Sequence, residues 1–163
     1  MSRQLDRLAE RILKKAKAAG LQIVTAESCT AGTVAHVLSK GEGASKHLAG
    51  GFVTYTKDMK SRVLGVPMAM LKSKSAVAAE IAEAMARGAL ARSGASIAVA
   101  VTGVAGPDPD EDGNPVGLIY CAVVRRGQAP RSVRLQSTAT QRRALIEEAT
   151  LEALTLLRGA CED

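Results

Sequence analysis

Apolar positions follow a helical period in some segments of the chain and form short unbroken runs in others. Leu5, Leu8, Ile12 and Ala16 recur at helical spacing and Gly20 follows as a stop, so the chain opens with a helix. Further helices are predicted between the turn at Glu27–Cys29 and Gly41, and over Lys57–Leu64, Ser75–Ser93 and Thr140–Leu157. Strands are predicted over Leu21–Ala26, Leu48–Tyr55, Ile97–Val101, Leu118–Val124 and Val133–Gln136.

Helices and strands therefore alternate along the chain, with a hairpin-like pair of strands near its end. This order predicts an α/β protein, a three-layer α/β/α arrangement around a mixed sheet. The 163 residues suit a single domain over positions 1–163, without an internal repeat or a linker. Because 47% of the residues are apolar and only one Phe and two Tyr are aromatic, the core must consist of Ala, Val, Leu and Ile.

The composition of the chain indicates which kinds of binding partner to expect. The net charge is +6, but basic residues are spread along the chain, which favours a solvated basic surface over a specific anion or nucleic-acid site. The scarcity of aromatic residues also argues against base stacking. Three cysteines without a CxxC motif predict neither a disulfide framework nor a zinc site. No run approaches the ~18 apolar residues of a membrane span. We therefore expect a cytoplasmic protein with no nucleic-acid or membrane partner, no cofactor and no metal.

The first segment with candidate chemistry is Thr25–Gly32 (TAESCTAG), where a strand runs into a helix through a short polar turn. Ser28 is expected at the N-terminus of that helix, where free N–H groups and the positive end of the helix dipole point outward. Taken alone, the segment favours a helix cap formed by Ser28 or Thr30. Two other interpretations are a nucleophilic Ser28, with the amides of Cys29 and Thr30 holding an oxyanion, and a phosphate-binding turn.

The second segment is Gly51–Val66, in which Tyr55 ends a strand and Lys60 follows about one helical turn later. A lysine that is partly shielded from water loses its proton more easily and can act as a base. The Tyr55 hydroxyl could relay a proton or orient the reacting pair. The segment alone favours a tyrosine at a sheet end and a solvated lysine.

A nucleophilic Ser28 would need an activator from elsewhere in the chain. The sequence has neither a Gly-x-Ser-x-Gly elbow nor a Ser-x-x-Lys motif. Cys29 is a poor alternative nucleophile, because His36 lies about two turns along the helix that begins beside it. Lys60 is therefore the best candidate for the base that activates Ser28.

The third segment is Val101–Gly117, rich in Gly, Pro and Asp and predicted to be a loop over residues 102–115. It follows a buried strand, and ligands of α/β proteins bind at the carboxyl ends of strands. Gly103 and Gly106 would let backbone amides approach an anion, although a Walker motif is absent. Acidic residues at alternate positions from Asp108 imitate a calcium loop, but the twelfth position is Ile119, where a bidentate Glu is needed. An exposed acidic loop is the simpler interpretation.

Four motifs, in order along the chain, carry a resemblance to a known family. They are AESCTAG, GFVTY followed by Lys60 and Leu-Gly-Val, TGVAGPD, and PVG. From Leu8 to Leu157 the chain resembles the CinA C-terminal domain family, whose stand-alone members are nicotinamide-nucleotide amidohydrolases of the PncC type. The resemblance implies a fold similar to anticodon-binding domains. It also implies hydrolysis of nicotinamide mononucleotide to nicotinate mononucleotide and ammonia, a step of pyridine nucleotide salvage.

The resemblance also assigns roles to residues. It implies Ser28 as the nucleophile and Lys60 as the base, with Tyr55 and Thr102 as further polar residues of the site. Arg142 matches the arginine of a late family signature, and we expect it to bind phosphate together with loop amides near Gly103–Gly106. We further expect a homo-oligomer.

The chain departs from the family pattern at four places. They are Ala31 for a glycine, Ser75-Ala76-Val77-Ala78 for Gly-Ala-Val-Ser, Asp108-Pro109-Asp110 for Asp-Gly-Gly, and Thr140-Gln141-Arg142 without its Gly and Asp. The last three concern substrate contacts more than the serine–lysine pair. Three other functions stay open: a nucleotide-binding or regulatory module without catalysis, a nucleic-acid binder, and an amidohydrolase for another small substrate.

Overall fold

The computed structural model describes residues 3–162, which form one layer of strands between two layers of helices. The sheet has the strand order β2–β1–β3–β4–β5. β1 is parallel to β2 and to β3, whereas β4 is antiparallel to β3 and to β5. The strands are β1 (Ile23–Glu27), β2 (Leu48–Val53), β3 (Ile97–Gly103), β4 (Leu118–Arg125) and β5 (Arg131–Gln136).

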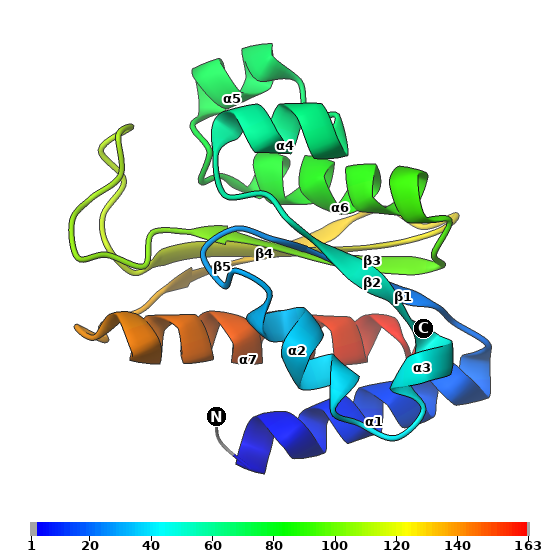
Figure 1. Cartoon of the computed structure of the whole chain (residues 1–163). Helices are drawn as coiled ribbons and strands as arrows, with labels where there is room; N and C mark the ends of the chain where they lie inside the picture. The colour runs from blue at the N-terminus through cyan, green and yellow to red at the C-terminus, as the bar shows by residue number, and fades with distance from the viewer. Residues whose placement is uncertain (1–2, 163) are drawn as a thin grey trace.

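Helices cover both faces of the sheet, as Figure 1 shows. α1, α2, α3 and α7 lie on one side, and α4, α5 and α6 lie on the other. Their bounds are α1 (Arg3–Ala19), α2 (Thr33–Ser39), α3 (Ala44–His47), α4 (Lys57–Leu64), α5 (Met68–Lys74), α6 (Ala79–Ser93) and α7 (Arg142–Ala160). The predicted three-layer α/β/α fold with a mixed sheet is confirmed. None of the helices within residues 3–162 is both long and apolar enough to span a bilayer.

The central strand β3 explains the unbroken apolar run of the sequence. Side chains alternate between the two faces of a strand, and both faces of β3 are covered. Val99 and Val101 belong to the core shared with α1 and α7, whereas Ala98 and Ala100 belong to the core shared with α6. Each helical layer therefore has its own apolar core on this strand.

Two short helices and the start of α6 differ from the sequence prediction. α3 and α5 were not predicted, because glycine and proline around them indicated turns rather than four- or seven-residue helices. α6 begins at Ala79 rather than at Ser75. Ser75 has φ +76°, outside the helical region, and Ala78 is extended.

The carboxyl ends of the three parallel strands meet at one edge of the sheet. The Glu27 carbonyl accepts a hydrogen bond from the Thr54 amide (2.8 Å), and the Ser28 amide donates to the Val101 carbonyl (3.0 Å). The segment after β1 is thereby tied to both neighbouring strands. β3 continues to Gly103 because it pairs with β4 up to that residue, so the loop is shorter than predicted.

Candidate active site

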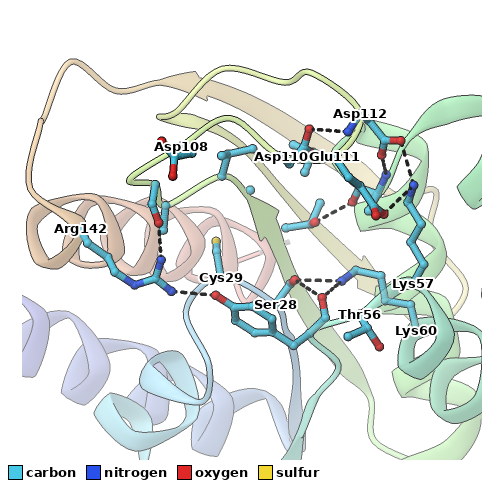
Figure 2. A pocket seen from close by; sticks show the side chains of 18 residues that line it. Ser28, Cys29, Thr56, Lys57, Lys60, Asp108, Asp110, Glu111, Asp112 and Arg142 are labelled. Atoms are coloured by element: carbon cyan, nitrogen blue, oxygen red, sulfur yellow. Dashed lines mark hydrogen bonds and ion pairs between the residues drawn. The ribbon is translucent and has the colours of Figure 1, made fainter.

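A cavity of about 370 Å³ opens at this edge of the sheet (Figure 2). Its walls come from the ends of the parallel strands, from α4, from the loop after β3 and from the start of α7. The residues predicted for the site that line it are Ser28, Cys29, Tyr55, Lys60, Thr102, Gly103, Gly106 and Arg142. Thr30 instead turns away, and its hydroxyl donates to Glu27 Oε2 (2.7 Å).

Ser28 and Lys60 meet in the interior of this cavity. Lys60 Nζ donates hydrogen bonds to Ser28 Oγ (2.8 Å), to the Thr54 carbonyl (2.8 Å) and to the Tyr55 carbonyl (3.1 Å). Lys60 is 1% exposed and Ser28 is 6% exposed. Residues 32 positions apart in sequence are thus held at proton-transfer distance.

The surroundings of Lys60 make it lose its proton more easily than a lysine in water. Burial lowers the pKa of Lys60 from its usual 10.5 to about 8, and the neighbouring Cys29 thiol opposes this shift only in part. Within residues 3–162, no carboxylate forms an ion pair with Lys60 that would hold its proton. Three acceptors match the three N–H groups of the ammonium form. After deprotonation, the lone pair of Nζ can face Ser28 Oγ.

The turn that carries Ser28 differs from the expectation. α2 begins at Thr33, after Ala31 and Gly32, both of which have positive φ (47° and 96°). Ser28 is therefore not at the helix N-terminus. Its hydroxyl faces Lys60 and the Tyr55 carbonyl (3.4 Å) rather than capping an amide. The N-terminal amides of α2 are occupied by the Glu27 carboxylate, which corrects the interpretation of this turn as a phosphate seat.

Glu27 is the site residue that sequence reasoning missed. It is completely buried, and both of its carboxylate oxygens accept hydrogen bonds from the segment that follows. An acidic side chain shortly before a helix start is a recognisable signal, since helix N-termini favour negative charge.

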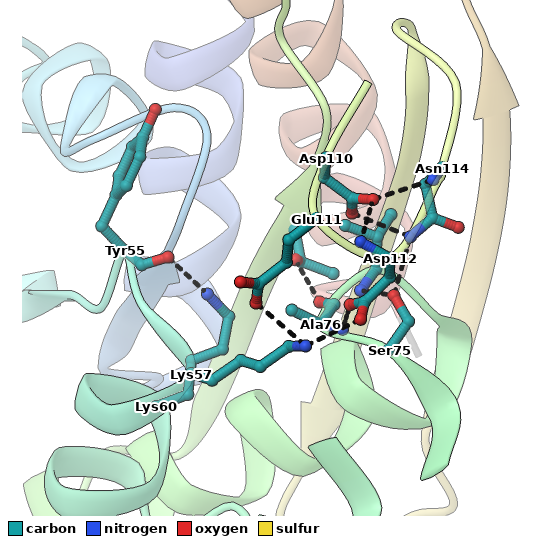
Figure 3. Close-up of polar contacts among 11 residues, drawn as sticks. Tyr55, Lys57, Lys60, Ser75, Ala76, Asp110, Glu111, Asp112 and Asn114 are labelled. Atoms are coloured by element: carbon teal, nitrogen blue, oxygen red, sulfur yellow. Dashed lines mark hydrogen bonds and ion pairs between the residues drawn. The ribbon is translucent and has the colours of Figure 1, made fainter. Parts of the chain in front are cut away.

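The hydroxyl and the backbone carbonyl of Tyr55 have partners at opposite ends of the cavity. Its hydroxyl accepts a hydrogen bond from Arg142 Nη2 (2.7 Å), and Arg142 Nη1 donates to the Gly106 carbonyl (2.6 Å). Figure 3 shows the Tyr55 ring pointing away from Lys60. The Tyr55 carbonyl, rather than the hydroxyl, contacts the Ser28–Lys60 pair. The structure therefore contradicts the hydroxyl contact that was expected to relay a proton or orient the pair.

Close packing explains a glycine both at position 103, which ends β3, and at position 106, in the loop that follows. A Cβ on Gly103 would lie 2.9 Å from Ile119 Cγ1 and from the Leu118 carbonyl oxygen. Gly106 has φ +73°, and a Cβ there would lie 3.0 Å from Val116. The neighbouring Thr102 hydroxyl donates to the Ala76 carbonyl (2.7 Å), which ties β3 to the segment before α6.

The acidic loop is held by a lysine (Figure 3). Lys57 Nζ lies 3.0 Å from Glu111 Oε1 and 2.8 Å from Asp112 Oδ1, and these partners raise the pKa of Lys57. Asn114 Nδ2 donates to Ser75 Oγ (2.7 Å), so the loop is also tied to the segment before α6. In residues 3–162, no group of three or more His, Cys, Asp or Glu side chains is arranged to hold a metal.

Cys29 lines the cavity but is a poor nucleophile. Its side chain is buried, and this burial raises the pKa of the thiol to about 12. The nucleophilic form of cysteine is the thiolate, which is almost absent at that pKa near neutral pH. The hydroxyl of Ser28 is therefore the reactive group that this end of the cavity offers.

The sheet order and this cavity define a three-layer α/β/α domain with a buried serine–lysine pair at the carboxyl edge of its parallel strands. The family model described as CinA C-terminal domain matches residues 5–161. A CinA-like protein of Geobacter sulfurreducens is 44% identical over 85% of this chain and 33% of its own length. A CinA-like protein of Mycobacterium marinum is 40% identical over 98% of this chain and 36% of its own length.

Solved structures of CinA and competence/damage inducible proteins have the same fold as this chain. The competence/damage inducible protein CihA of Agrobacterium tumefaciens has a TM-score of 0.94 and 37% identity, covering 100% of this chain and 98% of that one. A CinA superfamily protein of Klebsiella pneumoniae has a TM-score of 0.92 and 32% identity over 97% and 98% of the two chains. This chain belongs to the CinA C-terminal domain family. It spans about a third of the length of the curated relatives it matches.

Proposed function

We propose that this domain is an amidohydrolase that converts nicotinamide mononucleotide to nicotinate mononucleotide and ammonia. The observation that carries the proposal is the 2.8 Å contact between Lys60 Nζ and Ser28 Oγ inside a cavity. A buried amine with a lowered pKa beside a hydroxyl is an arrangement that activates a nucleophile. The family resemblance supplies the substrate, and the arginine at the cavity mouth fits its phosphate.

In the first half of the proposed reaction, neutral Lys60 takes the proton of Ser28 as Oγ attacks the carboxamide carbon. The negative charge that develops on the amide oxygen would be stabilised by the amides of Cys29 and Thr30, each worth roughly 3 kcal/mol in comparable sites. Neither amide donates to a backbone carbonyl within residues 3–162. Lys60 then gives its proton to the amide nitrogen, the C–N bond breaks, and ammonia leaves an ester on Ser28.

In the second half, Lys60 removes a proton from a water molecule that attacks the ester carbon. The bond to Oγ breaks, Lys60 returns the proton to Ser28, and nicotinate mononucleotide is released. Arg142 would bind the phosphate throughout, at the opposite end of the cavity from the reacting atoms.

The proposal is tested by incubating the purified protein with nicotinamide mononucleotide and measuring ammonia and nicotinate mononucleotide. Release of both in equal amounts supports the proposal. Tight binding of the nucleotide without turnover would instead indicate a binding or regulatory module of the same fold. Hydrolysis of another small amide, with none of this substrate, would reject the assigned substrate but retain the reaction class.

The rate of the proposed reaction should rise with pH, because only neutral Lys60 can accept the serine proton. Since the pKa of Lys60 is about 8, kcat/KM should increase about tenfold per unit below pH 8 and level off above it. Ammonia release measured from pH 6 to 9.5 gives the midpoint. Lys57→Met should keep this midpoint, because the pKa of Lys57 is raised. A pH-independent rate in this range would contradict Lys60 as the base.

Replacing Arg142 with Gln should weaken substrate binding more than catalysis. We expect KM for nicotinamide mononucleotide to rise at least about tenfold and kcat to change less than about threefold, since a bidentate contact with phosphate would be lost. Nicotinamide riboside lacks the phosphate, so its KM should not respond to the substitution. Arg143→Gln, beside the cavity rather than in its lining, is the matched control. Equal effects on the two substrates would refute the phosphate role.

Residues 1–163 would act as one amidohydrolase domain in the cytoplasm, where pyridine nucleotide salvage takes place, and would assemble as a homo-oligomer. Light scattering coupled to size-exclusion chromatography measures the mass of the assembly directly, and a monomer at working concentration would contradict the last of these.

A further inference from the structure

Glu27 is an acidic side chain in the interior that the proposed chemistry does not use. It ends β1, is 0% exposed, and is absent from the lining of the cavity. Its two oxygens accept five hydrogen bonds, two from hydroxyls and three from backbone amides. The donors are Thr25 Oγ1 (3.0 Å) and Ala35 N (2.9 Å) to Oε1, and Thr30 Oγ1 (2.7 Å), Gly32 N (2.9 Å) and Val34 N (3.1 Å) to Oε2.

These contacts replace the usual cap of a helix. The first amides of a helix lack partners, and an N-cap side chain normally accepts from them. The N-cap of α2 is Gly32, which has no side chain to do so. Glu27 accepts from these amides instead, and its negative charge lies at the positive end of the helix dipole. Burial of a charge is otherwise costly, so five donors are the compensation that such a site requires.

The same carboxylate fixes the turn that carries Ser28. One of its oxygens binds the side chain of Thr30 in the middle of the turn and the backbone at the end of the turn. At the other end, the backbone of Glu27 and Ser28 is tied to Thr54 on one side and to Val101 on the other. The turn therefore has fixed points at both ends and at its centre.

The neighbouring strand leaves room for this network. A Cβ on Gly51 of β2 would lie 2.5 Å from Thr25 Oγ1, the hydroxyl that donates to Glu27. It would also lie 3.2 Å from the side chain of Ala35, whose amide donates to the same oxygen. A side chain at position 51 would therefore collide with the Thr25 hydroxyl and crowd the first turn of α2, the two groups that bind Glu27.

We propose that Glu27 is the positioning residue of this site, which aims Ser28 Oγ at Lys60 and holds the amides of Cys29 and Thr30 in place through the turn between β1 and α2. The kinetic part of this inference rests on the proposed amidohydrolase function. Its structural part concerns one distance, the 2.8 Å between Ser28 Oγ and Lys60 Nζ. That distance can be measured whether or not the substrate is the proposed one.

Glu27→Gln is the sharpest test, because it keeps the shape of the side chain and removes acceptors. Wherever the amide NH₂ is placed, it meets a backbone N–H of the first turn of α2, so the turn must shift. A displacement of about 1 Å can cost about 100-fold in rate. We expect kcat to fall about 30- to 100-fold with KM within about twofold and with the pH midpoint of Lys60 unchanged. Thr30→Val removes one donor and should show a smaller loss of the same kind.

The matched control is Thr150→Val. This removes a buried hydroxyl that donates to the Ile146 carbonyl (2.7 Å) within α7, so it should lower stability without changing kcat. A folded Glu27→Gln protein with wild-type kcat would overturn the proposal. Should Glu27→Gln fail to fold, Thr30→Val decides: a lower kcat at unchanged KM supports the proposal, and wild-type kinetics overturn it.

Crystal structures of the wild-type and variant proteins separate this inference from the proposed function. In Glu27→Gln, the Ser28 Oγ–Lys60 Nζ distance should exceed about 3.5 Å, outside hydrogen-bond range, and in Thr30→Val it should lengthen by less. An unchanged distance would overturn the positioning role. A wild-type protein that leaves nicotinamide mononucleotide intact would overturn the proposed substrate, and the distance in the variants would still decide the role of Glu27.

Discussion

Ser28→Ala is expected to lower kcat for nicotinamide mononucleotide by at least about 1,000-fold, because the reaction then has no group to form the ester intermediate. The substitution removes one oxygen from a side chain that is 6% exposed and leaves the backbone of the turn tied to Val101. The melting temperature should therefore stay within a few degrees of wild type. Cys29 cannot take over the role, since its thiol stays protonated.

The measurement is ammonia release by the variant under conditions in which wild type is saturated. Ser39→Ala is a suitable control, because it removes an exposed hydroxyl of α2 that donates to the His36 carbonyl. It should leave kcat unchanged. If Ser28→Ala kept more than about a tenth of the wild-type rate, Ser28 would not be the nucleophile.

Lys60→Met should lower kcat by a similar factor and at the same time stabilise the fold. Met has nearly the length of Lys without the amine, so Ser28 loses its base but the space stays filled. At neutral pH wild type must bury the charged form of Lys60. The lowered pKa corresponds to a destabilisation of wild type by roughly 3 kcal/mol, which the variant avoids. The variant loses the hydrogen bonds to the Thr54 and Tyr55 carbonyls, and this loss offsets part of its gain in stability.

The pH dependence of this gain has a definite sign. In the unfolded chain Lys60 has its ordinary pKa of 10.5, so between about pH 8 and 10.5 the unfolded state binds more protons than the folded one. The free energy of unfolding of wild type is therefore free of this destabilisation above pH 10.5. The destabilisation develops as the pH falls from 10.5 through about 8. Urea unfolding should show Lys60→Met more stable than wild type by about 1–2 kcal/mol at pH 7, with the difference shrinking toward pH 10. A variant less stable at pH 7 would contradict the buried charge.

Much of the fold follows from local periodicity. α1, α4, α7 and the five strands have strong patterns of apolar residues, and the structure has an element at each of these places. The start of α6 was missed because Ala76, Val77 and Ala78 continue the helical pattern. Contacts from outside this segment override it: Asp112 accepts from the Ala76 amide and Ser75 from the Asn114 side chain.

The candidate site could be predicted from the sequence only in part. Ser28 follows the end of β1 and Lys60 lies in α4, and each segment alone favoured a helix cap or a solvated lysine. The family resemblance assigned the two residues their roles. Their pairing depends on strand order, since β1 and β2 are neighbours and α4 follows β2. The role of Glu27 depends on the exact path of five residues of backbone, and neither spacing nor residue type determines such a path. Positive φ at Ala31 and Gly32 is visible only in the structure.

Under the proposed function, the carboxylate at the end of β1 leaves no seat for a phosphate at the first turn of α2. An anion that approached the first turn of α2 would find those amides already bonded and a negative charge behind them. The guanidinium of Arg142 is at the solvent side, beside the half-exposed Tyr55. Under the proposed function, the aromatic ring therefore goes in first and the phosphate remains outermost. Ammonia is then released beside the buried Ser28 and Lys60, behind the bulk of the nucleotide.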